Sequence, residues 1–223
     1  MADNEKACRP GCCGSEGFGE LLKFTLAGYV GGLAAGLILD GLGHQRSGLG
    51  QWLVRTLAGE GESLLEGAYA ASRRIKGRAA SLSEAYGWGK LFGVALPWVV
   101  DGASRLAGVD VDGLAGFYIP FLYTQTDQMG ASIAGLIHFR REGRTWSAVL
   151  GRYLSHPVMV ASLGVIVGVP VGLLGARFAG FTPSTQFRTA LETIAANLCW
   201  LPPLVGWLIE RSGRERKNHK PQY

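Results

Sequence analysis

The chain has 223 residues, of which 48% are hydrophobic and only 17% are charged, whereas charged residues make up roughly 25% of a typical soluble domain. The charges gather in a few blocks, and the apolar windows between them approach the ~20 residues that a helix needs to cross a bilayer. The composition therefore argues against a soluble domain. It predicts an all-α, polytopic integral membrane protein with about five transmembrane helices.

The N-terminal arm, residues 1–19, is polar and contains Cys8, Cys12 and Cys13. These thiols leave three chemistries open: soft-metal binding, a disulfide on an oxidising side, or lipid attachment. They are weak candidates for a metal site, because no second cysteine pair or nearby histidine completes a zinc site. The apolar run at 20–40 is interpreted as the first span rather than a signal peptide, since no small-residue cleavage motif follows it.

Glycines recur at every fourth position in two of the apolar runs. A spacing of four places residues on one face of a helix, and small residues let two helix backbones approach closely in a membrane. Each run is therefore predicted to form a glycine-zipper groove that packs against the other groove or against a foreign helix. The grooves consist of Gly28, Gly32 and Gly36, and of Gly164, Gly168 and Gly172.

Residues 44–89 are interpreted as a cytoplasmic loop that carries amphipathic helices. Apolar residues recur there at helical spacing, and basic residues fall largely elsewhere, which is typical of a helix lying on a headgroup surface. The apolar side consists of Leu64, Ala68, Ala71, Ile75, Ala79 and Leu82, and the basic side of Arg73, Arg74, Lys76 and Arg78. The basic side either binds anionic lipid or a partner, or is a solvated face that only follows the positive-inside rule.

Two local signals lie at the edges of this loop. A shorter helix upstream is expected to end at the sequence GEGE. Ser81 followed by Glu84 fits a capping box that starts the next span.

Four more spans are predicted at residues 90–107, 114–139, 157–178 and 188–210, and a basic tail follows at 211–223. The span at 90–107 has a short apolar core and either crosses or re-enters. Polar and ionisable side chains inside a membrane are costly and often functional. The candidates are Asp101, Thr124, Gln125, Asp127, Gln128 and Glu192. Asp127 is expected to lie deepest, because polar residues surround it.

The distribution of basic residues predicts an orientation, since basic loops stay on the cytoplasmic side. One block runs from Arg46 to Lys90, a second follows the third span, and the last is the tail RSGRERKNHK. Five spans place all three blocks on one face. The expected protein therefore has its N-terminus outside and its C-terminus in the cytoplasm, in a bacterial inner membrane or its equivalent.

Catalytic motifs do not accompany these features: the sequence contains no P-loop, no HExxH and no GxSxG pattern. The preferred interpretation is a non-catalytic membrane subunit or assembly factor of a larger complex. The alternatives are a small channel or transporter with a polar pathway around Asp127, and a membrane-embedded enzyme. Neither a cofactor nor a nucleic-acid partner is predicted. The expected partners are the bilayer, anionic lipid headgroups, and other membrane subunits or a second copy of the chain.

Overall fold

The computed structural model describes residues 17–42, 48–108, 118–141, 145–178 and 198–218. Every regular element within these ranges is a helix, and none of these residues forms a strand. The all-α class expected from the composition is therefore confirmed. The described helices are α1 (Phe18–Gly41), α2 (Gly48–Ile75), α3 (Leu82–Leu106), α5 (Tyr118–Arg141), α6 (Trp146–Ser155), α7 (Pro157–Phe178), η2 (Leu198–Trp200) and α9 (Leu201–Asn218).

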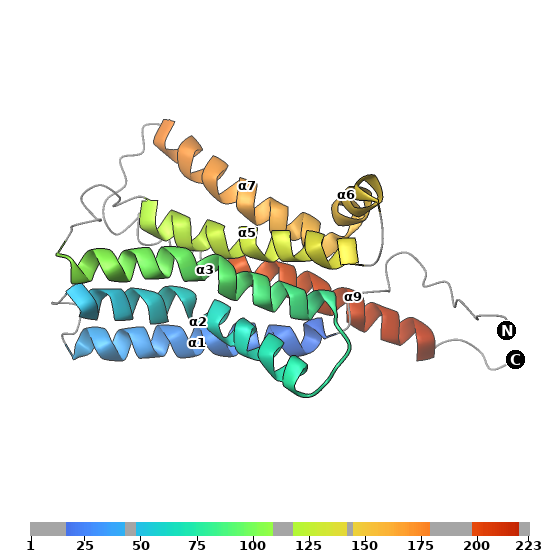
Figure 1. Cartoon of the computed structure of the whole chain (residues 1–223), viewed down its shortest axis with the longest axis horizontal. Coiled ribbons are helices and arrows are strands. Elements are labelled where there is room, and N and C mark those ends of the chain that lie inside the picture. The colour runs from blue at the N-terminus through green and yellow to red at the C-terminus, as the bar shows by residue number, and fades with distance from the viewer. Residues whose placement is uncertain (1–16, 43–47, 109–117, 142–144, 179–197, 219–223) are drawn as a thin grey trace, which may run out of the picture.

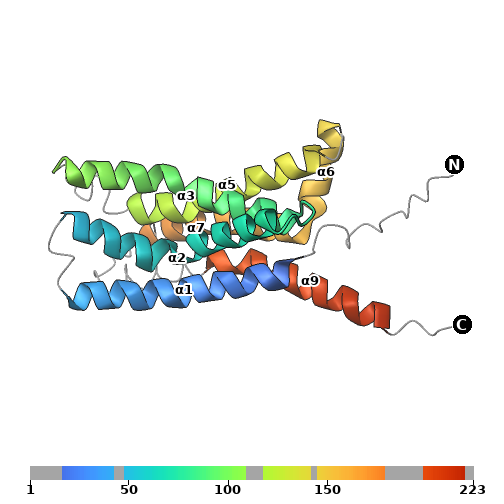
Figure 2. The ribbon, with the colours of Figure 1, turned by 60° about the horizontal axis from the view of Figure 1, so that its bottom comes forward.

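The long helices lie side by side in one bundle, and successive helices run in opposite directions (Figure 1, Figure 2). α1 packs on α2, α2 on α3, α3 on α5, and α5 on α7. α9 contacts both α1 and α7, so it closes the arrangement into a ring. The short helix α6 lies at one end of the bundle, against α5 and α7.

That end of the bundle also gathers the start of α1, the end of α2 and the end of α9 (Figure 1). The backbone N–H of Gly19 donates to Glu210 Oε2 at 2.9 Å, which ties α1 to α9 there. We call it the basic end, because α2, α5, α6 and α9 all contribute cations to it. These are Arg73, Arg74, Lys76 and Arg78 in and after α2, Arg140 and Arg141 in α5, Arg152 in α6, and Arg211 and Arg214 in α9.

Helix α2 occupies much of the region expected to be a loop. The predicted break at GEGE is wrong, because the helix continues through Gly59, Glu60, Gly61 and Glu62. Glycine lowers helix propensity by about 1 kcal/mol relative to alanine, but tertiary contacts routinely outweigh that difference. Here Gly61 lies directly against α1, where a larger residue would not fit.

The side of α2 that faces the interior of the bundle is its polar side. Ala68 is exposed and Ile75 is 86% exposed, and both belong to the expected apolar side. That side therefore lies on the outside of the bundle, and its contact with a headgroup surface stays a prediction. Its buried residues are largely polar, and they include Glu60, Glu62, Ser63, Glu66, Tyr69 and Arg73.

The start of α3 agrees with the predicted capping box. The backbone N–H of Glu84 donates to Ser81 Oγ at 3.2 Å. This bond satisfies one of the N–H groups that the first turn of a helix leaves free. The forward half of the capping box is therefore confirmed.

Glycine contacts bring α1 and α2 together. A Cβ atom added to Gly28 would lie within 3.0 Å of the backbone of Gly61 and Glu62, and a Cβ on Gly61 would lie 2.9 Å from the Cα of Gly32. Gly36, the third residue of the predicted groove, is buried as well. The first groove therefore faces α2, a helix of the same chain.

A second glycine contact, between α3 and α5, was not among the predicted grooves. Gly89 and Gly93 of α3 lie against the backbone of α5, and Gly130 of α5 lies against α3 in return. By contrast, Gly164 and Gly168 of α7 are exposed, and a Cβ at either would meet nothing within 4 Å. The surroundings of Gly172 fall outside the part that the structure describes.

Length and composition single out one described helix as able to cross a membrane, at Phe18–Leu39 in α1. The pair Trp146–Ser155 and Pro157–Gly168, bent by 80°, passes the same test as one unit, so the described residues hold one such helix or two. Core helices of soluble proteins and signal sequences pass this test too. The described residues therefore do not establish the five expected spans.

The outer surface of the bundle is nevertheless apolar where the interior is polar. On α5, Met129 and Ile133 are 48% and 54% exposed, whereas Asp127 and Gln128 are buried. Large exposed apolar side chains recur on the other helices. They include Leu26, Val30, Leu37 and Ile38 on α1, Phe92 and Val99 on α3, and Val160, Val167 and Val171 on α7.

The bend between α6 and α7 falls at His156, which caps both helices through its backbone. Its N–H donates to Tyr153 O at 3.2 Å, and its carbonyl accepts from the N–H of Met159 at 2.9 Å. Burial, and then the charges of Arg152 and His138, lower the pKa of His156 from its usual 6.5 to about 4. The imidazole is therefore neutral near pH 7 and adds no charge to the basic end.

The contact of Gly28 with α2 gives a matched prediction on one helix. Gly28→Ala should destabilise the protein by about 1–3 kcal/mol, because the added methyl group overlaps the backbone of α2. Gly31→Ala, at a site with nothing within 4 Å, should be neutral or stabilising by up to about 1 kcal/mol, since alanine favours helix. Thermal unfolding of both purified variants measures the difference, and equal melting temperatures would contradict the close contact.

Candidate functional site

A fully buried lysine joins three neighbouring helices in the middle of the bundle. Lys90 of α3 is 0% exposed. Its Nζ donates to Glu62 Oε1 of α2 at 3.2 Å and also to Asp127 Oδ2 of α5. Ser63 Oγ of α2 donates to the same Asp127 oxygen at 3.1 Å. A buried ammonium is tolerated when it is paired and hydrogen-bonded in this way.

Acidic groups outnumber the lysine at this site. Glu60 and Glu66 of α2 are 5% and 0% exposed, in addition to the buried Glu62 and Asp127. These four carboxyls against one ammonium would leave three negative charges uncompensated if all were ionised. A carboxylate that is buried without compensation takes up a proton instead. We call Lys90, Glu60, Glu62, Glu66 and Asp127 the Lys90 cluster. To balance its charge, the cluster must hold protons or a further cation.

The bonding of Glu66 itself calls for a proton. Thr25 Oγ1 of α1 lies 3.1 Å from the Leu21 carbonyl oxygen and 2.5 Å from Glu66 Oε1. A carbonyl oxygen only accepts hydrogen bonds, and a threonine hydroxyl has one proton to donate. Both contacts are satisfied when Thr25 donates to Leu21 and a protonated Glu66 donates to Thr25.

A second set of hydrogen bonds continues from the cluster to α7. Gln128, next to Asp127, accepts from Tyr86 Oη at 3.0 Å and from Ser162 Oγ at 3.1 Å. Its Nε2 donates to the carbonyl of Cys199 at 3.4 Å, and Ser162 Oγ lies 3.0 Å from Ser132 Oγ. Buried polar side chains of α1, α2, α3, α5 and α7 thus contribute to one interior site.

Polar side chains also lead from the cluster toward the basic end along α2. Glu62, Glu66, Tyr69 and Arg73 follow each other at spacings of four, three and four, which places them on one side of the helix, and all are buried. At 1.5 Å per residue this side extends about 16 Å. Tyr69 Oη donates to the Gly17 carbonyl at 2.9 Å and lies 2.9 Å from Ser83 Oγ.

Three side chains at this site also carry atoms that can bind a metal ion. Glu62, Asp127 and Cys199 present ligand atoms that lie within 4.8 Å of one another, a spacing that suits one ion. Lys90 Nζ already contacts both carboxylates, and its charge repels a cation from the space between them. A metal would therefore require Lys90 to withdraw or to lose its proton, whereas protons fit with Lys90 in place.

Of the predicted intramembrane residues, Asp127 and Gln128 lie at this interior site. Asp101 lies in α3, and Thr124 and Gln125 lie in α5, but their side chains are outside the described part. Glu192 falls outside the described residues altogether, as do Cys8, Cys12 and Cys13. Cys199 is buried beside Gln128.

The four predicted surface cations do not form one surface. Arg73 is buried, with 8% exposure, whereas Arg74, Lys76 and Arg78 are exposed. Arg74 is nearest to Glu84 at 3.9 Å, and Arg78 donates to Glu20 Oε2 at 2.7 Å. At the basic end, Arg73 therefore lies on the buried polar side of α2, and the other three lie on the surface.

Lys90, Glu62 and Glu66 are not among the site residues predicted from the sequence. The pattern of charges assigns Lys90 to a basic loop, and helical periodicity assigns the region of the glutamates to a surface loop. The signal that identifies them is the spacing of polar residues on α2 together with the small residues Gly89 and Gly93 on either side of Lys90. Such small residues mark a helix face that lies against another backbone.

Comparison of the chain with protein families, with curated proteins and with solved structures finds no match in any of the three.

The Lys90 cluster predicts non-additive effects on stability. Lys90→Met should destabilise the protein by about 3–5 kcal/mol, because it leaves buried carboxylates without their cation. Adding Asp127→Asn to that variant should restore part of the loss, since the amide needs no counter-charge. Lys23→Met removes an exposed lysine of α1 and serves as the control. Thermal unfolding of the four variants, Asp127→Asn alone included, gives the coupling energy, and simple additivity would contradict the ion pair.

Proposed function

We propose that this chain is a multi-span membrane protein whose interior relays protons. The observation that carries the proposal is Lys90, fully buried and paired with Asp127 and Glu62 beside two further buried carboxyls, inside a bundle with an apolar exterior. The small-transporter interpretation of the sequence, with its pathway around Asp127, is thereby favoured over the non-catalytic subunit.

The membrane assignment is supported by buried ionisable side chains that occur together with large exposed apolar ones. Soluble proteins rarely bury lysine and glutamate fully. Within the described helix that is apolar enough to span a membrane alone, only 33% of the apolar window is buried inside the bundle. Glu62, Glu66, Lys90 and Asp127 make α2, α3 and α5 less apolar, but all four are buried and point away from the exterior.

The shape of the bundle changes the proposed orientation. Five spans would put the two termini of the chain on opposite faces of the membrane. However, the first described residues of α1 and the last of α9 lie at the same end of the bundle (Figure 2). We propose that α2 crosses in addition to the expected spans, so that the number of crossings is even. The basic end then faces the cytoplasm, as the positive-inside rule requires, and both ends of the described chain are cytoplasmic.

Single cysteines in a background without native cysteines test this orientation. Cysteines placed at Glu20, Lys76 and Ser147 mark the basic end, and one at Ala107 marks the opposite end of α3. A membrane-impermeant maleimide added to intact cells should label only the Ala107 site. Labelling of Glu20 and Lys76 from opposite sides of the membrane would contradict the proposal.

A proton route follows from the contacts of the described residues. Tyr69, Ser83 and Ser81 form a chain of hydroxyls at 2.9 Å spacing near the basic end. Glu66 lies one helical turn from Tyr69 on α2, and Glu62 and Asp127 share Lys90 beyond it. In the proposed cycle Lys90 remains charged. When a proton arrives at the carboxylate of Glu62 or Asp127, that carboxylate becomes neutral, and the Lys90 ammonium moves toward the other one.

Asp127→Asn tests the relay, because an amide has the shape of the carboxyl group but cannot take up and release a proton near neutral pH. In vesicles that contain the purified protein, we expect this variant to lower the proton flux driven by a pH gradient by about tenfold or more. Glu215→Gln, which alters a carboxyl that is 61% exposed on α9, should keep the flux of the parent. Absence of proton flux through the parent protein would reject the relay.

A second candidate function rests on the outer face of α7. Gly164 and Gly168 are exposed there, whereas Gly28 and Gly61 are packed against backbone. An open small-residue face supports the alternative that the chain is a subunit held in a larger complex or in a self-assembly. Gly168→Ile would then dissociate the assembly in mild detergent without changing the melting temperature of the isolated chain.

A further inference from the structure

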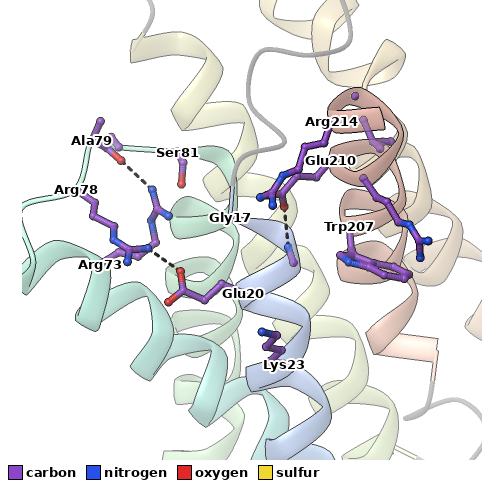
Figure 3. A pocket seen from close by; sticks show the side chains of 15 residues that line it. Gly17, Glu20, Lys23, Arg73, Arg78, Ala79, Ser81, Trp207, Glu210 and Arg214 are labelled. Carbon is purple, nitrogen blue, oxygen red and sulfur yellow. Dashed lines mark hydrogen bonds and ion pairs between the residues drawn. The ribbon is translucent and has the colours of Figure 1, made fainter. Parts of the chain in front are cut away.

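A cavity of about 990 Å³ opens at the basic end, away from the Lys90 cluster. The start of α1, the segment between α2 and α3, and the last turns of α9 form its walls (Figure 3). Ligand pockets for small molecules usually measure about 300–1,000 Å³, so this cavity is large enough for a polar headgroup. Glycines of α1 and α9, together with Ala79 and Ala80, leave the space open.

Positive charge predominates in the lining. Five cationic side chains and two acidic ones face the cavity, an excess of three positive charges. The cations are Lys23, Arg73, Arg78, Arg211 and Arg214, and the acids are Glu20 and Glu210. Arg78 is paired with Glu20 at 2.7 Å, Arg214 with Glu210, and Arg211 with Glu215 at 3.1 Å, a residue outside the lining. After these pairs are formed, Lys23 and Arg73 carry the remaining positive charge.

Arg73 is the member of this lining that points to a ligand. Its side chain is held by a hydrogen bond from Nη2 to the Ala79 carbonyl at 3.3 Å and by the ring of Tyr69, 5.9 Å away. Its Nε is buried and has no hydrogen-bond partner among the described residues. Burying a guanidinium N–H without a partner is costly. An acceptor oxygen in the cavity would remove that cost.

Arginine in the lining favours phosphate as the group that supplies this oxygen. Arginine presents a planar fork of donors that suits phosphate oxygens. Trp207, over which Arg211 lies at 5.7 Å, adds an aromatic surface to the lining. Basic pockets between helices at the cytoplasmic face of a membrane bind the phosphates of lipid headgroups.

We propose that this cavity is a binding site for a phosphate-bearing anion, held by Arg73 and Lys23. The proposal does not require proton transfer, although Ser81 belongs both to the lining and to the hydroxyl chain. The same chemistry is offered by an anionic phospholipid headgroup and by free phosphate. The lipid is the expected source on the proposed orientation, which puts the basic end at the cytoplasmic face of the membrane.

Binding is measured with the full chain purified in a neutral detergent. Three probes are added in turn: phosphatidylglycerol in mixed micelles, phosphatidylcholine in mixed micelles, and inorganic phosphate. We expect saturable binding of phosphatidylglycerol, little of phosphatidylcholine, and a loss of affinity as salt is raised. Equal saturation by inorganic phosphate would support the site and assign it to free phosphate. Failure of both anions to bind would overturn the proposal.

Variants identify the residues that bind. Lys23→Gln, at an exposed position, should weaken phosphatidylglycerol binding roughly fivefold, and Arg73→Gln should weaken it further. Arg74→Gln is the matched control, since Arg74 neighbours Arg73 in sequence, is 71% exposed and does not line the cavity. Equal affinities for Lys23→Gln, Arg74→Gln and the parent would overturn the site even if Arg73→Gln does not fold.

Discussion

Burial of the Lys90 ammonium is the constraint on which the rest of the bundle depends. A cation removed from water needs carboxylates at hydrogen-bonding distance, and these come from α2 on one side and α5 on the other. Gly89 precedes Lys90 by one residue and Gly93 follows it by three, and both lie against the backbone of α5. The glycines therefore set the close approach of α3 and α5 that lets Lys90 reach Asp127. The ion pair and the glycine contact belong to one interface.

The same constraint decides which side of α2 faces inward. Once Glu62 pairs with Lys90, helical spacing places Glu66, Tyr69 and Arg73 inside as well, and Ala68 and Ile75 outside. The inward side of α2 is thus polar, beside an apolar core that includes Phe18, Leu82 and Phe139. Large apolar side chains on the exterior favour apolar surroundings, and this supports the proposal that the bilayer is the solvent of the bundle.

The sequence predicts helix positions well where a run is uniformly apolar and poorly where a helix is polar on its buried side. The spans expected at 20–40 and 157–178 nearly coincide with α1 and α7. α2 was placed at a surface because periodicity shows that a helix has two sides but not which side is buried. Lys90 was assigned to a loop because its charge is an ordinary sign of exposure. Its partners Glu62 and Asp127 are 28 and 37 residues away in the chain, so only the packing of the helices brings them together.

The position of Arg73 bears on which cation the proposed relay would accept. Arg73 lies at the basic end of the buried side of α2, and its fixed positive charge would oppose the passage of a metal cation along that side. A proton does not need to pass as an ion beside Arg73, because the hydroxyls of Tyr69, Ser83 and Ser81 can hand it on between neighbours. An anion held by Arg73 in the adjacent cavity would offset part of the opposing charge. Occupation of the phosphate site would then ease proton entry into the proposed relay without altering the carboxylates that Lys90 holds, so the anion would act at the entrance of the relay and not at the Lys90 cluster.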